Sequence, residues 1–151
     1  YRRTLYTFWK RSALPASMEL FNAPTRENCT VRRERTNTPL QALVTMNGPQ
    51  FVEASRFLAQ NAIQAKGEEF DPVLDYMTER VLARRFGGKE RRAARRTYKD
   101  FQAHYQANME EARLLIATGE SELQEGLPLV ESAALTMLAN QLMNLDEALN
   151  K

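Results

Sequence analysis

Residues 129–145, LVESAALTMLANQLMNL, decide the fold class of this chain. Leu127-Pro128 precedes them as a helix start, and the segment is apolar on most of its helical circumference, which indicates a central, buried helix. Its longest uncharged run, Ser132 to Leu145, spans 14 residues. This is shorter than the run of about 18 that a membrane helix needs. We therefore expect a buried core helix and no membrane span.

The clearest helix start in the first half of the chain is Thr38-Pro39-Leu40-Gln41. Its threonine can act as N-cap, its proline suits the first helical position, and its glutamine can bond back as in a capping box. Asn47-Gly48-Pro49 then ends one helix and starts another, whose apolar stripe runs from Phe51 to Ile63. A short turn of helix is also expected over residues 17–21.

Two more helices are expected between this region and the last helix. Asp71-Pro72 supplies an N-cap and a first helical residue, and Gly87-Gly88 supplies a terminator. Residues 89–117 carry one apolar stripe, which predicts a single long helix. Strand patterning is nearly absent. The sequence therefore predicts an all-α fold, a bundle of about five helices over residues 38–151, preceded by an extended aromatic and Arg-rich arm over residues 1–37.

The 151 residues suit one helical domain, residues 1–151, which we interpret as the C-terminal fragment of a larger multidomain protein. The net charge of +2 hides a division along the chain. Residues 1–99 carry 19 Lys/Arg against 10 Asp/Glu, a net of +9, and residues 100–151 carry 2 against 9, a net of −7. We favour pairing of the two halves within the chain. The alternative is a basic face open to an anionic partner.

The residues that could carry catalysis are few. Cys29 is the one cysteine, which excludes an internal disulfide framework and a thiolate metal cluster. His104 is the one histidine and has no ligand pattern around it, and no spacing marks two carboxylates as an acid–base pair. We predict no catalytic residue and no metal ligand in this chain, and whether the parent protein is an enzyme stays open.

A dense basic cluster could track phosphates or sulfates. No nucleic-acid fold signature surrounds it, so nucleic acid is the weakest of the candidate partners. A solvated face, or pairing with the acidic loop residues Glu120, Glu122 and Glu125, is favoured. The cluster consists of Arg84, Arg85, Lys89, Arg91, Arg92, Arg95, Arg96 and Lys99.

The loop within residues 29–43, CTVRRERTNTPLQAL, concentrates hydrogen-bonding side chains before a helix start. The planar fork of arginine suits bidentate pairing with carboxylates or anionic ligands. The favoured interpretation is a structural clamp on the acidic C-terminal residues Asp146 and Glu147, and the alternative is a docking or binding surface. The candidate docking residues, with one aromatic from the arm, are Arg32, Arg33, Arg35, Thr36, Asn37 and Trp9.

Several stretches carry a family resemblance: RRTLYTFWKR at residues 2–11, PASM at 15–18, FNAPTRE at 21–27, the loop at 29–43, and NLDE at 144–147. They resemble the planctomycete PSD1 family, a domain of unknown function numbered fifteen fifty-three. The similarity covers nearly the whole chain and is most specific at residues 2–11 and 26–47. The chain departs from the family at Asn22 and near Thr25, where acidic residues are expected.

The resemblance implies an exported, extracytoplasmic parent protein that often carries an N-terminal c-type cytochrome domain. Any haem c would then lie outside this chain, which is expected to hold no cofactor itself. The upstream domains of the same polypeptide are the expected partners, and an anionic carbohydrate is a further candidate. We expect a non-catalytic docking or interaction module. The alternative is part of a multidomain redox or polysaccharide-processing enzyme whose site the upstream domains complete.

Overall fold

The computed structural model confirms the all-α prediction. The described residues form eight α-helices and no β-strand. Seven of the helices fall within residues 38–151, where about five were expected, because the last short helix and one break in a long helix had no strong sequence signal. The structure describes residues 6–10, 14–25, 27–32, 34, 36–122, 124 and 126–149.

The chain divides into two compact units, residues 1–44 and residues 45–151. We call the first the N-terminal unit and the second the helical unit. Helix α2 (Pro39–Asn47) spans the boundary between them. The sequence analysis placed a division after residue 37 and treated the whole chain as one domain. Both statements remain predictions.

The N-terminal unit contains α1 (Ala16–Leu20) and the beginning of α2. The expected short helix near residue 17 is therefore present. The expected capping box at α2 is also present: the Thr38 amide donates to Gln41 Oε1 at 3.0 Å, and the Gln41 amide donates to Thr38 Oγ1 at 3.3 Å. These two bonds satisfy backbone donors that a helix start leaves without an intrahelical partner.

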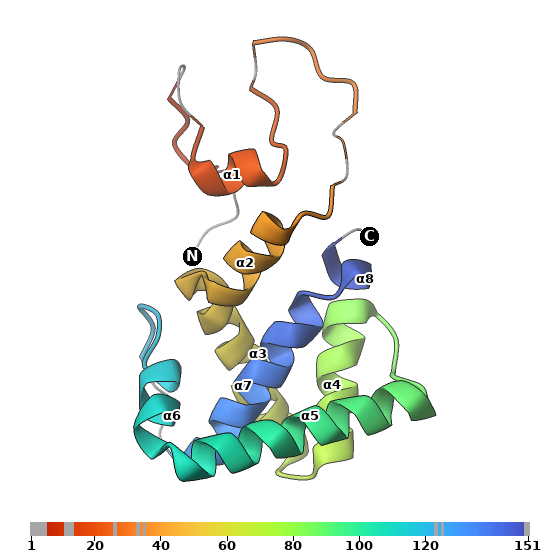
Figure 1. The fold of residues 1–151 in the computed structure, drawn as a ribbon, viewed down its shortest axis with the longest axis vertical. Coiled ribbons are helices and arrows are strands. Elements are labelled where there is room, and N and C mark those ends of the chain that lie inside the picture. The colour runs from red at the N-terminus through yellow and green to blue at the C-terminus, as the bar shows by residue number, and fades with distance from the viewer. Residues whose placement is uncertain are drawn as a thin grey trace. The chain divides into compact units, whose positions relative to one another are not determined.

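The helical unit is organised around α7 (Leu129–Met143), as its continuous apolar sequence predicted (Figure 1). Helices α3, α4, α5 and α6 each contact α7, so it is enclosed on most sides. The last short helix, α8, follows α7 and contacts it. The bounds of the surrounding helices are Pro49–Lys66 for α3, Phe70–Leu82 for α4, Gly88–Ala107 for α5, Met109–Ile116 for α6 and Asp146–Leu149 for α8.

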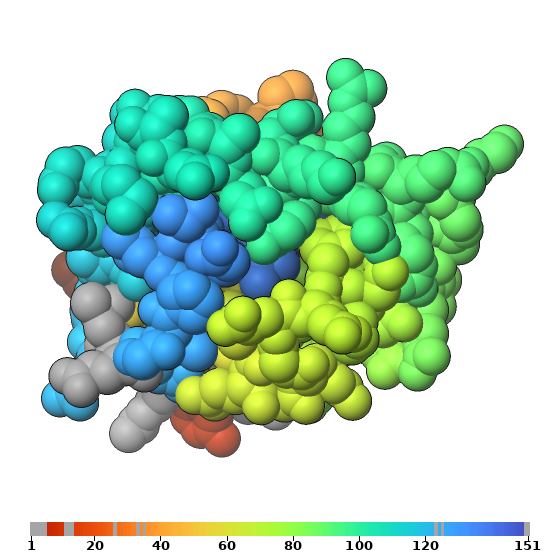
Figure 2. All heavy atoms as spheres, turned by 90° about the horizontal axis from the view of Figure 1, so that it is seen from below, coloured from red at the N-terminus to blue at the C-terminus, as the bar shows by residue number. Residues whose placement is uncertain are grey.

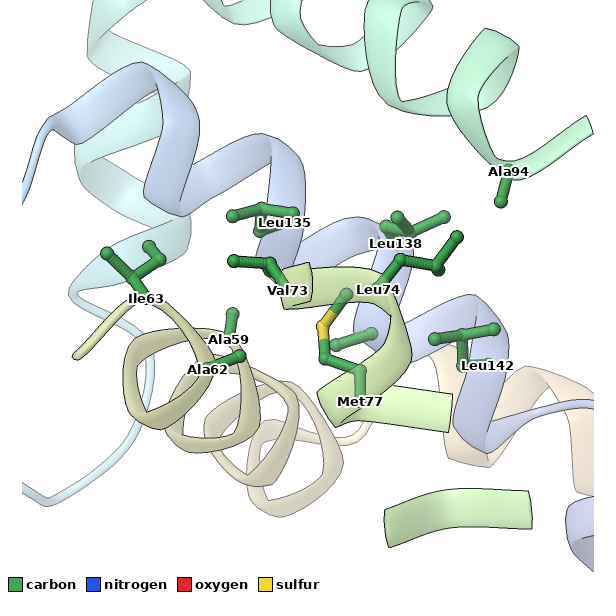
Figure 3. Packing of buried hydrophobic residues seen from close by; sticks show 11 residues of the cluster. Ala59, Ala62, Ile63, Val73, Leu74, Met77, Ala94, Leu135, Leu138 and Leu142 are labelled. Carbon is green, nitrogen blue, oxygen red and sulfur yellow. The ribbon is translucent and has the colours of Figure 1, made fainter. Parts of the chain in front are cut away.

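The main core of the helical unit lies where α3, α4 and α7 meet, and α5 closes it (Figure 3). Met77 and Leu74 of α4 are fully buried and point toward Leu138 and Leu142 of α7. A fully buried side chain of this size stabilises the fold by about 1.5–3 kcal/mol. A second, smaller cluster joins α5, α6 and α7 around Tyr105.

Two helix boundaries differ from the sequence prediction. Helix α4 begins at Phe70 with Glu69 as N-cap, so Asp71 lies in the first turn instead of capping it, and it binds arginines of α5. The helix ends at Leu82, and its C-cap residue Ala83 adopts a left-handed conformation with φ of 58°. Gly87 therefore begins α5 rather than ending α4.

The long helix expected over residues 89–117 is broken. Asn108, with φ of −129° and ψ of 66°, separates α5 from α6, and its side-chain amide donates to the His104 carbonyl at 2.9 Å. Asparagine competes with the helix in this way because its side chain offers the backbone an alternative hydrogen bond. The apolar stripe continues across the break, so the hydrophobic period alone could not locate it.

A buried ion pair fastens the loop after α6 to α3. Arg56 and Glu53 approach to 3.6 Å, with side chains 1% and 2% exposed. Arg56 donates to the carbonyls of Ile116 and Ser121 at 3.0 and 3.1 Å, and Glu53 accepts from the Ser121 amide at 2.9 Å and from its hydroxyl. Gly119 lies against the same carboxylate. The charges are therefore compensated by each other and by backbone groups, as buried charges must be.

Helices in the described part of the chain are too short or too polar to cross a lipid bilayer.

Candidate functional site

The helical unit has an open pocket of about 560 Å³ between α5, α7 and α8. This volume is in the range of small-molecule and side-chain sites, roughly 300–1,000 Å³. Its floor is apolar, and two of its residues, Ala93 and Leu145, are exposed at the mouth. The apolar residues of the lining, from floor to mouth, are Phe86, Ala93, Ala94, Leu138, Leu142 and Leu145. We call this the α5–α7 pocket.

The rim of the α5–α7 pocket is an ionic cluster centred on Arg84. Its guanidinium donates to Glu147 through Nε at 2.9 Å and Nη2 at 2.8 Å, and to Glu90 through Nη1 at 3.0 Å and Nη2 at 2.7 Å. Nη1 also donates to the Arg85 carbonyl at 3.3 Å. Since a guanidinium has five N–H donors, these bonds use all of them.

Glu90 is held in place from two sides. Besides Arg84, it accepts from the Gly87 amide at 2.7 Å, which is the reciprocal bond of a capping box at the start of α5. The Arg84 hydrogen bond and, secondarily, the Gly87 amide hold the pKa of Glu90 at about 2. The same hydrogen bonds to Glu90 and Glu147 raise the pKa of Arg84 above its ordinary value. Arg84 and Glu90 are therefore charged at neutral pH.

The rim has a net negative charge. One positive group, Arg84, faces three negative ones, Glu90, Asp146 and Glu147, so the rim carries a formal charge of −2. Arg84 has no donor left for an anionic ligand. The pocket can therefore take an apolar group that bears or adjoins a positive charge, and it disfavours an anion.

A second ionic group links α4 to α5 and the turn before it, and it contains three of the eight residues of the basic cluster. Arg91 pairs with Asp75 at 2.6 Å and with Asp71 at 3.4 Å, and Arg95 also pairs with Asp71. The Arg95 hydrogen bond is the main cause that lowers the pKa of Asp71. Arg85 likewise pairs with Glu79, 2.5 Å away. The carboxylates that neutralise these arginines thus belong to α4, and not to the acidic loop that the sequence suggested.

Thr36, one of the predicted docking residues, is tied into the N-terminal unit. Its hydroxyl accepts from Asn22 Nδ2 at 2.7 Å and from Gln41 Nε2 at 2.8 Å, and Gln41 Nε2 also donates to the Leu20 carbonyl at 2.6 Å. Two donors fill the acceptor capacity of a hydroxyl. Asn22 stands where the resemblance led us to expect an acidic residue, and an ionised carboxylate could not donate to Thr36.

The other predicted docking residues are distributed as follows. Arg32 and Asn37 are exposed, and Trp9 is half-buried. Arg33 and Arg35 lie outside the described residues. The role of all these residues in docking therefore stays a prediction.

The predicted clamp partners Asp146 and Glu147 lie in α8, on the rim of the α5–α7 pocket. Glu147 pairs with Arg84, and its predicted pairing with the loop arginines is untested. Sequence reasoning counted Arg84 among the basic residues but missed the pocket. The available signal was Glu90 itself, an acid three residues after Gly87 whose carboxylate can accept the N-cap amide of a helix start.

Neither of the two residues considered for nucleophilic or metal chemistry lines the pocket. Cys29 is an exposed free thiol of the N-terminal unit, and His104 of α5 lies 2.8 Å from Glu111 on the surface. Within the described ranges, no three histidine, cysteine or acidic side chains are grouped as a metal site requires.

The comparisons with known proteins give a family and no further relative. A family model described as PSD1, a protein of unknown function (DUF1553), matches residues 1–98. No curated protein and no solved structure matches the chain. The matched residues cover the N-terminal unit, α3, α4 and the first half of α5, including Arg84 and Glu90 of the pocket rim. Since the match spans most of the sequence, the chain belongs to the PSD1 family of proteins of unknown function.

Proposed function

We propose that the helical unit is a docking module whose α5–α7 pocket receives an apolar side chain, flanked by basic groups, from a partner polypeptide. The observation that supports this is the combination of an apolar floor with a rim of charge −2. Burial of an aliphatic side chain supplies about 1.5–3 kcal/mol. The acidic rim supplies specificity, because charged rims select partners and their orientation more than they add affinity.

The floor of the pocket is suited to this purpose. Leu138 and Leu142 are nearly fully buried and belong to the main core, so the floor is rigid. Ala93 and Leu145 are exposed at the mouth. A preformed apolar pocket lowers the entropy cost that binding would otherwise carry.

The proposal is tested with short model peptides and methyl NMR of the whole chain. The probes are three capped tripeptides: lysine-leucine-lysine, glutamate-leucine-glutamate and lysine-glycine-lysine. We expect the first alone to shift the methyl signals of Leu138, Leu142 and Leu145, because only it carries both an apolar side chain and flanking positive charge. Equal responses to all three peptides, or a response confined to the glycine peptide, would contradict the proposal.

Two matched variants locate the binding. Ala93→Trp places a large ring at the mouth of the pocket on an exposed position of α5. Ala103→Trp makes the same change at an exposed position of α5 away from the pocket. We expect the first to abolish the response to lysine-leucine-lysine and the second to leave it unchanged. Loss of binding in both, or in neither, would place the peptide elsewhere.

The partner is proposed to be an upstream domain of the same polypeptide, in an exported parent protein with a c-type cytochrome domain. The support is the resemblance of residues 2–47 to the family. A pull-down of the upstream region by the chain, lost in Ala93→Trp and retained in Ala103→Trp, is the expected result. Retention in both variants would separate that interaction from the pocket.

A further inference from the structure

Helix α5 carries a line of exposed cations on a face next to that of its paired arginines. The four residues follow the spacing i, i+3, i+7 and i+10, so they share one helical face. None of them forms an ion pair or hydrogen bond with any residue that the structure describes. Figure 2 shows α5, in green to teal, lying along one face of the helical unit with side chains extending into solvent. We call the set Lys89, Arg92, Arg96 and Lys99 the cationic stripe.

We infer that the cationic stripe binds a sulfated or carboxylated polysaccharide. The inference goes beyond the docking pocket, because no residue of the stripe lines that pocket. The inference rests on the absence of a carboxylate partner for the four described stripe residues. Their sequence neighbours Arg91 and Arg95 differ, because Asp75 and Asp71 neutralise them. A linear polyanion gains affinity at such a stripe by releasing its condensed counterions.

The face of the stripe offers charge and little else. The aromatic side chains of α5 lie elsewhere: Tyr105 is buried, and Tyr98 and Phe101 pack against the core clusters. Single-stranded nucleic acids are held by stacking on exposed aromatic side chains, and a partner helix or a membrane surface needs apolar contact. This face of α5 has neither an exposed aromatic side chain nor an apolar surface among the described residues. A ligand there must therefore be held by charge.

The surroundings of the stripe favour a narrow ligand. The helical unit carries 13 Lys/Arg against 16 Asp/Glu, a net of −3. Domains that bind nucleic acid are usually basic as a whole, with a pI above about 9. A duplex would bring phosphates over the acidic neighbours of the stripe, including Asp100 at its C-terminal end. A single polysaccharide chain can contact the cations without covering them.

The spacing of the cations also suits a polysaccharide. Successive residues of the stripe lie about 4.5 to 6 Å apart along the helix axis, because each residue rises about 1.5 Å. This interval is close to the length of one pyranose unit. It is clearly longer than the repeat of polyphosphate, the other narrow polyanion without bases.

The experiment uses the whole chain and a fluorescent heparin decasaccharide, with binding followed by polarisation between about 50 and about 200 mM salt. Arg92→Gln/Arg96→Gln removes two charges from the stripe. The matched control Lys66→Gln/Arg113→Gln removes two exposed charges from α3 and α6. Circular dichroism checks that each variant keeps its helices. Asp100→Asn removes a negative charge beside the stripe and should therefore strengthen binding.

We expect a plot of log affinity against log salt with a slope of about −3, as four contacts imply. The stripe variant should bind about tenfold or more weakly with about half that slope. The control should stay within about twofold of the unmodified chain, and Asp100→Asn should bind more tightly. The inference is overturned if the stripe variant binds as well as the control, if heparin does not bind at low salt, or if duplex DNA or polyphosphate of equal charge binds more tightly.

Discussion

The chain contains two arginine–glutamate clusters of similar chemistry in opposite surroundings. Arg56 and Glu53 are 1% and 2% exposed and sit between α3 and the loop after α6. Arg84, Glu90 and Glu147 are 41%, 42% and 39% exposed and form the rim of a pocket. The exposed cluster has the shorter ion-pair distances, 2.7 and 2.8 Å against 3.6 Å.

The comparison teaches that burial, and not the length of the ion pair, decides what each cluster does. Removing one partner of a buried pair leaves a charge that water cannot reach. Removing one partner of an exposed pair leaves a charge that water hydrates at once, so exposed pairs add little to stability. The buried cluster therefore belongs to the fold, and we propose that the exposed cluster acts in recognition.

The largest difference is expected between the matched substitutions Arg56→Ala and Arg84→Ala. Arg56→Ala leaves the Glu53 carboxylate buried without its counter-charge, which should lower the free energy of unfolding by about 3–5 kcal/mol. Arg84→Ala should change it little. Chemical denaturation of both variants measures the difference. Equal losses would remove the distinction between the two clusters.

A steric test at Gly119 probes the buried cluster from the loop side. Gly119 has φ of 111°, and a Cβ there would overlap the carboxylate of Glu53. Gly119→Ala should cost about 2–4 kcal/mol, from backbone strain and forced repacking together. Gly67→Ala is the control, because Gly67 also has a positive φ, 79°, but open space around its Cβ. It should cost only the strain of a conformation that favours glycine, about 1–3 kcal/mol. A Gly119→Ala loss no larger than the Gly67→Ala loss would show that the loop is free to move.

The exposed cluster should make the free energy of unfolding depend on pH through Glu90. The pKa of Glu90 is about 2, against an ordinary value of 4.5, because Arg84 and the Gly87 amide bind its charged form. The stabilising contribution of a carboxylate with a lowered pKa is complete above the unfolded value and is lost as the pH falls toward the folded value. We thus expect this contribution to vanish between about pH 4.5 and about pH 2.

The measurement is a carboxyl-carbon NMR titration of Glu90 in the unmodified chain and in Arg84→Gln. In the variant the pKa of Glu90 should rise by about one unit or more toward its ordinary value. An unchanged titration curve would mean that the Arg84 contact is not formed in solution.

Much of the fold was predictable from the sequence because apolar periodicity and helix caps are local signals. The buried helix at 129–145 and the capping box at Thr38 and Gln41 were both predicted and are present. The break at Asn108 was missed because the apolar stripe runs through it and the break depends on one side-chain bond to the His104 carbonyl.

The candidate site was predicted less well, because it depends on residues far apart in the chain. Arg84 and Glu147 are 63 positions apart, and no local pattern connects them. The same holds for Glu53 and Ser121, 68 positions apart, whose contact determines the loop after α6. In contrast, the bond from the Gly87 amide to Glu90 could have been recognised, since an acid three residues after an N-cap is a local signal.

The most direct test of the assignment is Glu147→Gln, measured for both unfolding and binding of the lysine-leucine-lysine peptide. Glutamine keeps the shape of the side chain and lowers the rim charge from −2 to −1. The account predicts an unfolding free energy close to that of the unmodified chain together with weaker peptide binding. A large loss of stability with unchanged peptide binding would contradict it and assign the exposed cluster to the fold.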